Sequence, residues 1–206
     1  MSAADAASFL RLTRGAREFL GQSDRYGHSV RVARHAGTLA RIHGVDVHKA
    51  RVAGLLHDLA RLFTPARLLS ECEMRGIPIE PFERAHPMLL HARLGAAIAR
   101  ERFGIEDDEI LSAMAKHTTA AGRMSPLDCV VYLADSLEPA RTFPERRELW
   151  ELARRDLRAA VRETLLTAFR HHARKGKVPA PAMLAAARAF GIDPAAVSLE
   201  VHASAS

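Results

Sequence analysis

The feature that most constrains this chain is a regular alternation of helical patterns and helix-breaking residues. Apolar residues recur every three or four positions between the breakers, and no stretch alternates as a strand would. Aromatic residues make up only 5% of a chain that is 48% hydrophobic. The core must therefore consist mainly of Leu, Ala, Val and Ile, and Ala and Leu are strong helix formers. We predict one all-α domain.

The breakers divide the chain into predicted helices. These cover residues 3–20, 25–43, 47–61, 65–75, 88–103, 107–118, 125–138, 145–173 and 180–190. Asp46 is a candidate N-cap, and Asp107 or Asp108 is another, because their side chains can accept orphan backbone N–H groups. Gly44 and Gly104 stand where helices often end in a left-handed residue. Residues 201–206 are predicted to form a frayed tail.

Charge and cysteine content limit the partners and the compartment. The net charge of +6 favours anionic partners such as nucleotides or nucleic acid, although arginines that merely solvate helices would give the same balance. The chain has no recognisable nucleic-acid-binding motif, so no nucleic acid is expected. Cys72 and Cys129 form neither a metal-binding pair nor a disulfide framework. With no evident signal peptide or membrane span, we predict a cytoplasmic protein with free thiols.

The stretch LLHDLAR, residues 55–61, places His57 and Asp58 inside an apolar helical pattern. Both side chains are costly to bury without partners. A divalent ion beside the helix would coordinate the imidazole and the carboxylate together and remove that cost. Gly54, one turn earlier, would leave room for a close approach.

Further candidate ligands lie on other predicted helices. His28, His91, His117 and Asp135 follow helical patterns, and Asp135 again interrupts an apolar run. Each histidine alone is more typical of a packed or surface residue than of a ligand. The ordered set of His, His-Asp, His, His and Asp, with both acids in apolar helices, indicates a metal site.

This ordered set resembles the HD-domain metal-dependent phosphohydrolases, an all-α family. Five motifs are similar to its YqeK-like branch of symmetrical diadenosine-tetraphosphate hydrolases, and the similarity runs from about residue 10 to residue 185. These motifs are RYGHSVRVA (25–33), LLHDLAR (55–61), HARLGA (91–96), KHTTAAGRM (116–124) and VVYLADSLEPARTFP (130–144). We therefore predict a single HD-domain helical bundle over residues 10–185, with a metal site at its centre and the N-terminal helix and C-terminal tail packed on it or frayed.

The resemblance implies a role for each motif residue. The metal ligands would be His28, His57, Asp58 and Asp135. The ligand types suit iron, manganese or another first-row ion better than calcium, and the family implies iron. Asp58, His91 and His117 would be catalytic, although His91 and His117 could instead hold a second ion. The implied substrate contacts are Arg25, His28, Asp58, His91, His117, Thr118, Asp135 and Arg141.

The function that the resemblance implies is symmetrical cleavage of diadenosine tetraphosphate into two ADP. Two alternatives stay open: action on another nucleotide, and nucleotide binding or sensing with little turnover. Nucleic-acid binding would rest on charge alone. A homodimer is a further prediction. Glu138 is expected to make a structural hydrogen bond or ion pair, and residues 153–163 to form an exposed, Arg-rich helix face.

Overall fold

A computed structural model describes residues 3–21 and 23–197. Those residues form helices and connecting loops and contain no strand, so the all-α prediction is confirmed. The elements are α1 (Ala3–Leu20), α2 (Asp24–Ile42), α3 (Val47–Leu56), α4 (Pro65–Met74), α5 (Pro81–Ala85), the 3-10 helix η1 (Pro87–Leu90), α6 (His91–Phe103), α7 (Asp108–Lys116), α8 (Pro126–Ser136), α9 (Arg146–Ala153), α10 (Leu157–Arg174) and α11 (Pro181–Ala189).

Several helix boundaries follow from local chemistry. The Asp46 side chain accepts a hydrogen bond from the Lys49 backbone at the start of α3. At the start of α7, the residue that caps is Asp107, whose side chain accepts from two backbone N–H groups. Gly44 and Gly104 have φ of 67° and 65°, the left-handed conformation that ends a helix. These caps are confirmed.

The predicted helix over residues 145–173 is wrong, because the chain forms two helices there. Asp156 has an extended backbone, with φ of −148°, and its side chain accepts a hydrogen bond from the Ala159 N–H at the start of α10. An N-cap residue cannot itself continue a helix. The short helix α5 was also missing from the prediction.

Two predicted helix ends lie too far along the chain. α3 ends at Leu56 rather than at residue 61, so His57 occupies its C-cap and Asp58 lies in the turn that follows. α7 ends at Lys116, and His117 occupies its C-cap. The prediction that His57 and Asp58 lie inside a helix is therefore wrong.

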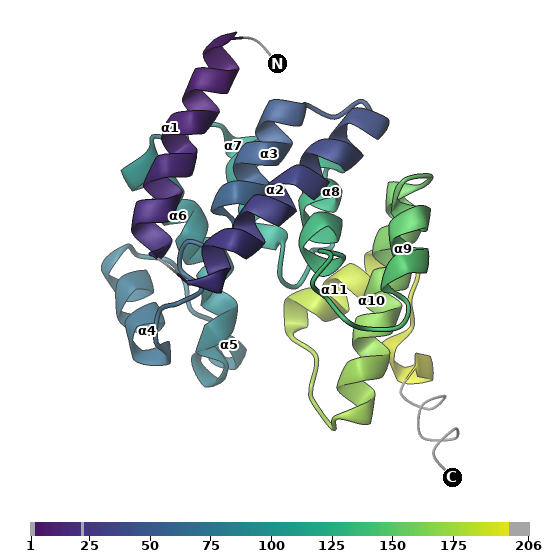
Figure 1. The fold of residues 1–206 in the computed structure, drawn as a ribbon. Coiled ribbons are helices and arrows are strands. Elements are labelled where there is room, and N and C mark those ends of the chain that lie inside the picture. Colours follow the sequence, from purple (N-terminus) through teal and green to yellow (C-terminus); the bar gives the residue numbers. More distant parts are fainter. Residues whose placement is uncertain (1–2, 22, 198–206) are drawn as a thin grey trace.

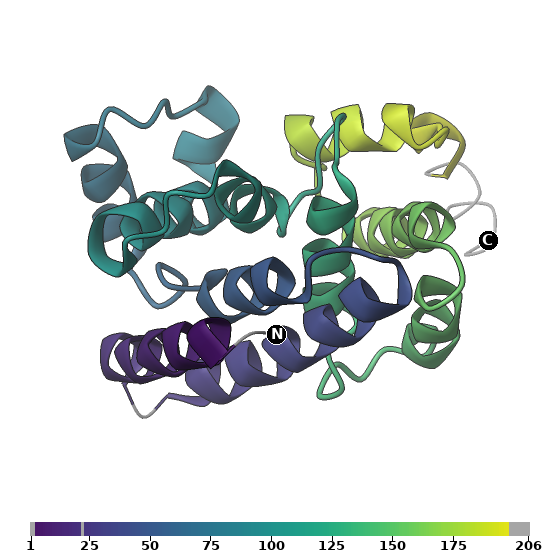
Figure 2. The same ribbon diagram turned by 90° about the horizontal axis from the view of Figure 1, so that it is seen from above.

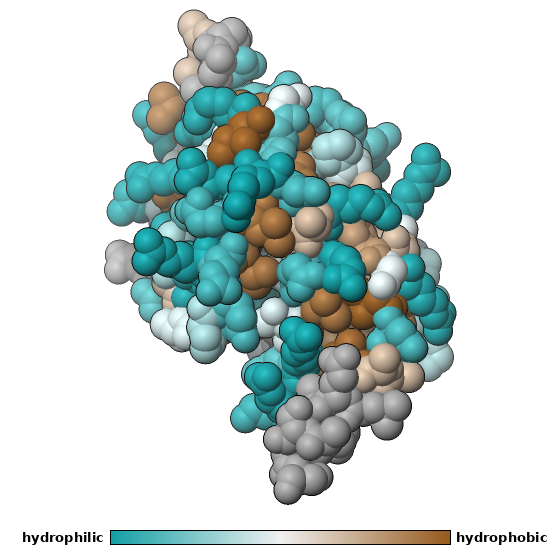
Figure 3. All heavy atoms as spheres, turned by 90° about the vertical axis from the view of Figure 1, so that its right-hand side faces the viewer, coloured by the Kyte–Doolittle hydropathy of each residue, from teal (hydrophilic) through white to brown (hydrophobic). Residues whose placement is uncertain are grey.

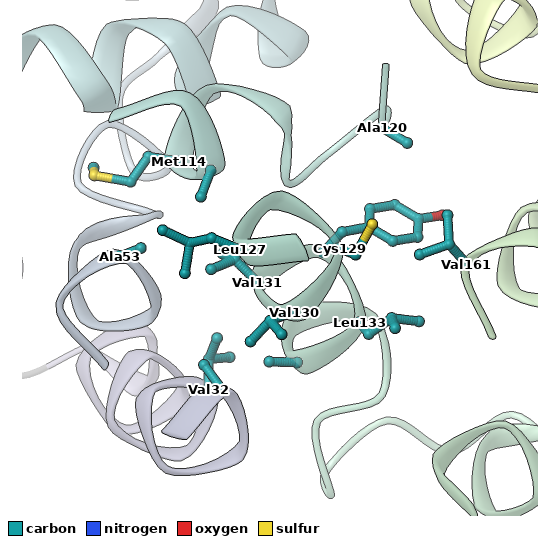
Figure 4. Close-up of a cluster of buried hydrophobic side chains, with 14 of the residues drawn as sticks. Val32, Ala53, Met114, Ala120, Leu127, Cys129, Val130, Val131, Leu133 and Val161 are labelled. Carbon is teal, nitrogen blue, oxygen red and sulfur yellow. The ribbon is translucent and has the colours of Figure 1, made fainter. Parts of the chain in front are cut away.

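Helix α8 stands at the centre of the molecule, with α2, α3 and α7 on one side and α9, α10 and α11 on the other (Figure 1, Figure 2). Its apolar residues face both sides. Figure 4 shows Val130 and Val131 toward Val32 of α2 and Ala53 of α3, whereas Leu133 lies toward α10. A helix that is apolar on nearly all faces is buried, and α8 carries Asp135 into this interior.

Two glycines allow close contact between helices near the site. A Cβ atom on Gly54 would lie 3.0 Å from the Ala33 Cα atom, so Gly54 lets α3 press against the backbone of α2. A Cβ atom on Gly95 would lie 3.3 Å from the carbonyl oxygen of His57. Gly54 thus makes room for a neighbouring helix rather than for an ion.

The outer elements complete the bundle. A cluster of buried hydrophobic residues runs from Ala16 in α1 to Val197.

The domain limits of 10–185 stay a prediction, and the predicted tail at residues 201–206 lies outside the described residues. The predicted Arg-rich stretch at residues 153–163 does not form one helix face, because the turn between α9 and α10 interrupts it. Its four arginines are exposed: Arg154 and Arg155 in the turn, and Arg158 and Arg162 on α10. The side of the molecule that α9 and α10 form is largely hydrophilic (Figure 3). No helix in the described ranges is both long and apolar enough to span a bilayer.

Candidate metal centre

Three of the candidate histidines are fixed by backbone carbonyl groups at helix ends. The Nδ1 atom of His57 lies 2.8 Å from the Gly54 oxygen, and that of His117 lies 2.7 Å from the Met114 oxygen. His91 makes the same contact with the residue three positions before it, at 2.5 Å. The last carbonyl groups of a helix lack intrahelical partners. Each ring donates its Nδ1–H to such a carbonyl and keeps Nε2 free.

The free Nε2 atoms converge on a common centre. The Nε2 atoms of His28 and His57 are 3.3 Å apart, and those of His91 and His117 are 3.2 Å apart. The Oδ1 atom of Asp135 lies 3.0 Å from the Nε2 atom of His28. Neutral Nε2 atoms that present lone pairs to each other repel, so this arrangement requires protons or a cation between them.

Asp58 lies between the two histidine pairs. Its Oδ2 atom is 3.3 Å from the Nε2 atom of His57 and 3.7 Å from that of His28. Its Oδ1 atom is 3.3 Å and 3.6 Å from the Nε2 atoms of His91 and His117. One carboxylate oxygen therefore faces each pair, which is the geometry of a carboxylate that can bridge two ions.

The donor set fits a first-row divalent ion. Three overlapping groups have ligand atoms within 4.8 Å of one another: His28, His57 and Asp58; His57, His117 and Asp135; and Asp58, His91 and His117. Donors that sit about 2.1 Å from an ion lie roughly 3 Å from each other, as these do. Imidazole together with carboxylate suits such ions and not calcium. A metal-binding site at the centre of the bundle, as predicted, is supported.

The charges at the centre are strongly coupled. Burial alone would raise the pKa of Asp58, but the neighbouring His57 charge and hydrogen bonds from His117, His57 and His91 hold that pKa well below its usual range. Burial is the strongest single influence and lowers the pKa of His57. The charge and hydrogen bond of Asp58, the Asp135 charge and the Gly54 carbonyl together outweigh burial and raise the pKa to about 9. For His117 burial dominates and lowers the pKa. The metal-free centre therefore holds a proton on His57 that an ion must displace.

The predicted phosphate-binding residues surround this centre. Arg25 donates a hydrogen bond to Asp58 Oδ2 at 2.8 Å, and Arg141 donates to Asp135 Oδ1 at 2.9 Å. The Thr118 hydroxyl lies 3.1 Å and 3.3 Å from the Nε2 atoms of His117 and His91. The structure thus brings together all nine residues predicted to form the site.

The centre opens into a pocket of about 660 Å³, whose lining by α10 was not predicted from the sequence. One wall comes from α10, through Thr164, Thr167, His171 and His172, and Phe143, in the segment between α8 and α9, also lines the pocket. In the sequence, His171 stands in a stretch rich in arginine and lysine, which does not by itself indicate a pocket. The spacing of Thr164, Thr167 and His171 along one helix face was the available signal.

Comparisons with known proteins agree with this site. The HD domain family matches residues 25–140, more than half of the chain. The chain belongs to the HD family. The match contains His28, His57, Asp58 and Asp135, so the resemblance seen in the sequence is confirmed.

HD relatives cover most of the chain. It is 34% identical over 166 residues to "Bis(5'-nucleosyl)-tetraphosphatase, symmetrical" of Halalkalibacterium halodurans, an alignment that covers 78% of this chain and 86% of that protein. The Bacillus subtilis protein of the same name is 36% identical over 146 residues, which cover 68% and 75% of the two chains. The fold matches a Clostridium acetobutylicum structure described as a predicted HD superfamily hydrolase involved in NAD metabolism. Its TM-score is 0.84 at 31% identity, covering 88% of this chain and 96% of that one.

Proposed function

We propose that this HD protein hydrolyses diadenosine tetraphosphate symmetrically, releasing two molecules of ADP. The observation that carries the proposal is a buried His/Asp centre, flanked by Arg25 and Arg141, at the base of a pocket large enough for a nucleotide. The names of the relatives over most of the chain support the same substrate. Water would add to an inner phosphorus, and the central bridging oxygen would leave with ADP.

The proposed ion is held by His28, His57, Asp58 and Asp135. Iron is the identity that the family resemblance favours, and manganese or another first-row ion would suit the same ligands. A second ion would take Asp58, His91 and His117. When bound, such an ion lowers the pKa of water and offsets charge on phosphate oxygens.

The remaining site residues act on the polyphosphate. Arg25 and Arg141 exchange their present carboxylate partners for phosphate oxygens, to which a guanidinium can donate two parallel hydrogen bonds. If only one ion binds, His91 and His117 are free to hydrogen-bond the inner phosphates and to protonate the leaving oxygen of ADP. The Thr118 hydroxyl is placed to bind the same oxygens.

A second candidate is hydrolysis of a different dinucleotide. The solved structure that shares this fold is linked by its title to NAD metabolism, and NAD is also a dinucleoside polyphosphate, with two phosphates instead of four. The number of phosphates is the feature that separates the two candidates, because a shorter bridge brings fewer charges to Arg25 and Arg141.

Product analysis tests the proposal. The protein, reconstituted with Fe²⁺ or Mn²⁺, is incubated with diadenosine tetraphosphate, diadenosine triphosphate, ATP and NAD⁺, and the products are separated by chromatography. We expect ADP as the sole product from the tetraphosphate and slower or no cleavage of the others. AMP with ATP would contradict symmetrical cleavage. Faster cleavage of NAD⁺ would favour the second candidate.

We also propose a cytoplasmic location, which the two buried, free thiols of Cys72 and Cys129 support. The homodimer stays a prediction. Light scattering of the purified protein would give its mass in solution and test it directly.

A further inference from the structure

His28 differs from the other three histidines of the centre. It lies within α2 rather than at a helix end, and carbonyl groups inside a helix already accept backbone hydrogen bonds. Its Nδ1 atom instead lies 3.4 Å from the Oε2 atom of Glu138. A carboxylate therefore occupies the place that a backbone carbonyl takes beside His57, His91 and His117.

The Glu138 side chain is buried, and both of its carboxylate oxygens have partners. It is 2% exposed and follows Asp135 by three residues, just past the end of α8. Its Oε1 atom accepts hydrogen bonds from the Arg31 side chain and from the Ala140 backbone N–H, the latter at 3.2 Å. These bonds leave Oε2 directed at His28. A buried carboxylate persists only when it is paired in this way.

Arg31 and Glu138 connect two segments that carry proposed ligands. Arg31 lies on α2, three residues after His28, while Glu138 is reached from Asp135 within the same short turn. The charge on Arg31 offsets that of Glu138, so the pair adds no net charge next to the centre. The ion pair thereby fixes the position of the segment that bears Asp135 relative to the helix that bears His28.

We propose that Glu138 is a positioning residue that accepts the Nδ1–H of His28 and so keeps its Nε2 atom unprotonated toward the metal centre. This inference rests on the proposed metal centre but not on the proposed substrate. Acceptors behind ligating histidines fix the tautomer and raise the basicity of the ring, and their loss typically weakens metal binding by about 10- to 100-fold.

The first test measures metal affinity without any substrate. Mn²⁺ binding to the metal-stripped protein is followed by competition with a fluorescent chelator for wild type, Glu138→Ala and Glu138→Gln. We expect about 10- to 100-fold weaker binding for Glu138→Ala and a smaller loss for Glu138→Gln, which keeps the shape and an acceptor oxygen. Glu71→Gln is the matched control: Glu71 also binds two arginines, Arg67 and Arg75, but lies on α4, away from the pocket.

The second test observes the His28 ring in the metal-free protein. Nitrogen-15 NMR distinguishes the two neutral tautomers, and the His28 signal is identified by its loss in His28→Asn. We expect the Nδ1 atom of His28 to be protonated in wild type and to be protonated to a smaller extent in Glu138→Ala. Circular dichroism checks that each variant folds. If Glu138→Ala does not fold, Glu138→Gln carries both tests.

The outcomes separate this proposal from the metal centre itself. Wild-type affinity and an unchanged tautomer in a folded Glu138 variant would overturn the positioning role and leave the metal centre standing. If the wild type binds no Mn²⁺, the metal centre fails, and the tautomer measurement alone then decides whether Glu138 orients His28.

Discussion

The two walls of the pocket are built differently. The inner wall is the side that carries the metal centre, and His91 and His117 line the pocket there while His28 and His57 lie behind them. Each of these four histidines has its Nδ1 atom against a carbonyl or carboxylate oxygen. On the outer wall, formed by α10, the Thr164 hydroxyl and the His172 Nδ1 atom are buried without a hydrogen-bond partner in the described part of the chain. Hydrogen-bonded groups are held in place, whereas the Thr164 hydroxyl and the His172 Nδ1 atom can still accept a hydrogen bond from a ligand or donate one to it. The inner wall is preorganised for phosphate chemistry, and the outer wall is suited to selecting the nucleotide.

Replacing Asp58 gives the largest expected effect, because it removes the one residue that lies within 3.7 Å of all four Nε2 atoms. We expect Asp58→Asn to lose its metal and to lower kcat/KM by about 10³-fold or more. Metal analysis and steady-state kinetics check this. Asp128→Asn is the matched control: Asp128 is equally buried but binds Lys116, so that variant should lose stability and retain its metal. An active Asp58→Asn enzyme would refute the importance of the inner wall.

Replacing Arg141 separates phosphate binding from metal binding, because Arg141 lines the pocket and also donates a hydrogen bond to Asp135. A hydrogen bond to a charged group is worth about 1.5–3 kcal/mol, so Arg141→Ala should lower kcat/KM by about 10- to 100-fold while leaving the metal content unchanged. Arg154→Ala, which removes an exposed arginine paired with Glu151, should have no effect. If Arg141→Ala loses its metal, Arg141 acts by holding Asp135 in position and not by binding phosphate.

Metal removal should expose a pH dependence that belongs to the inner wall. His57 has a folded pKa of about 9 against an ordinary value of 6.5. The folded state therefore holds this proton more tightly than the unfolded state, which adds stability below pH 6.5 that is lost as the pH rises to 9. Urea unfolding of the chelator-treated protein should show a falling midpoint between pH 6.5 and 9, and His57→Asn should flatten it. A flat wild-type profile would contradict the proposed charge coupling.

Changes on the outer wall should be smaller and confined to binding. His171 lines the pocket but does not contact the centre. We expect His171→Ala to raise KM for diadenosine tetraphosphate by about 3- to 10-fold with kcat nearly unchanged, the pattern for an interaction made equally in ground and transition states. Arg174→Ala, on the same helix but outside the pocket lining, is the control. A fall in kcat of similar size would show that the two walls are not separable.

The starts of α3 and α7 were predictable from the sequence, whereas the helix ends at the site were not. Asp46 and Asp107 cap through contacts with residues two or three positions away, so local sequence identifies them. The stretch around His57 keeps a helical apolar pattern past Leu56, and the helix ends there because the ring and its neighbours serve the centre. The same applies at His117. Tertiary requirements override local propensity at such sites.

The convergence of the candidate ligands was predictable because they interrupt apolar helical patterns in a recognisable order, whereas the outer wall offered no comparable signal. His171 and His172 stand among basic residues, a pattern typical of solvated helix faces. Their access to the pocket depends on how α10 packs against α8, a contact between distant segments. The predicted structural hydrogen bond or ion pair of Glu138 is confirmed by its contact with Arg31, but nothing in the sequence alone pairs Glu138 with His28.

A crystal structure of the protein stripped of metal and reloaded with Mn²⁺ would test the metal centre most directly, through the anomalous signal of the ion. We predict a peak bound by His28, His57, Asp58 and Asp135, at about 2.0–2.2 Å from the ligand atoms. A second peak beside Asp58, His91 and His117 would establish a two-ion centre. If the anomalous map shows no ion at this centre at Mn²⁺ concentrations that support full activity, the central claim is wrong.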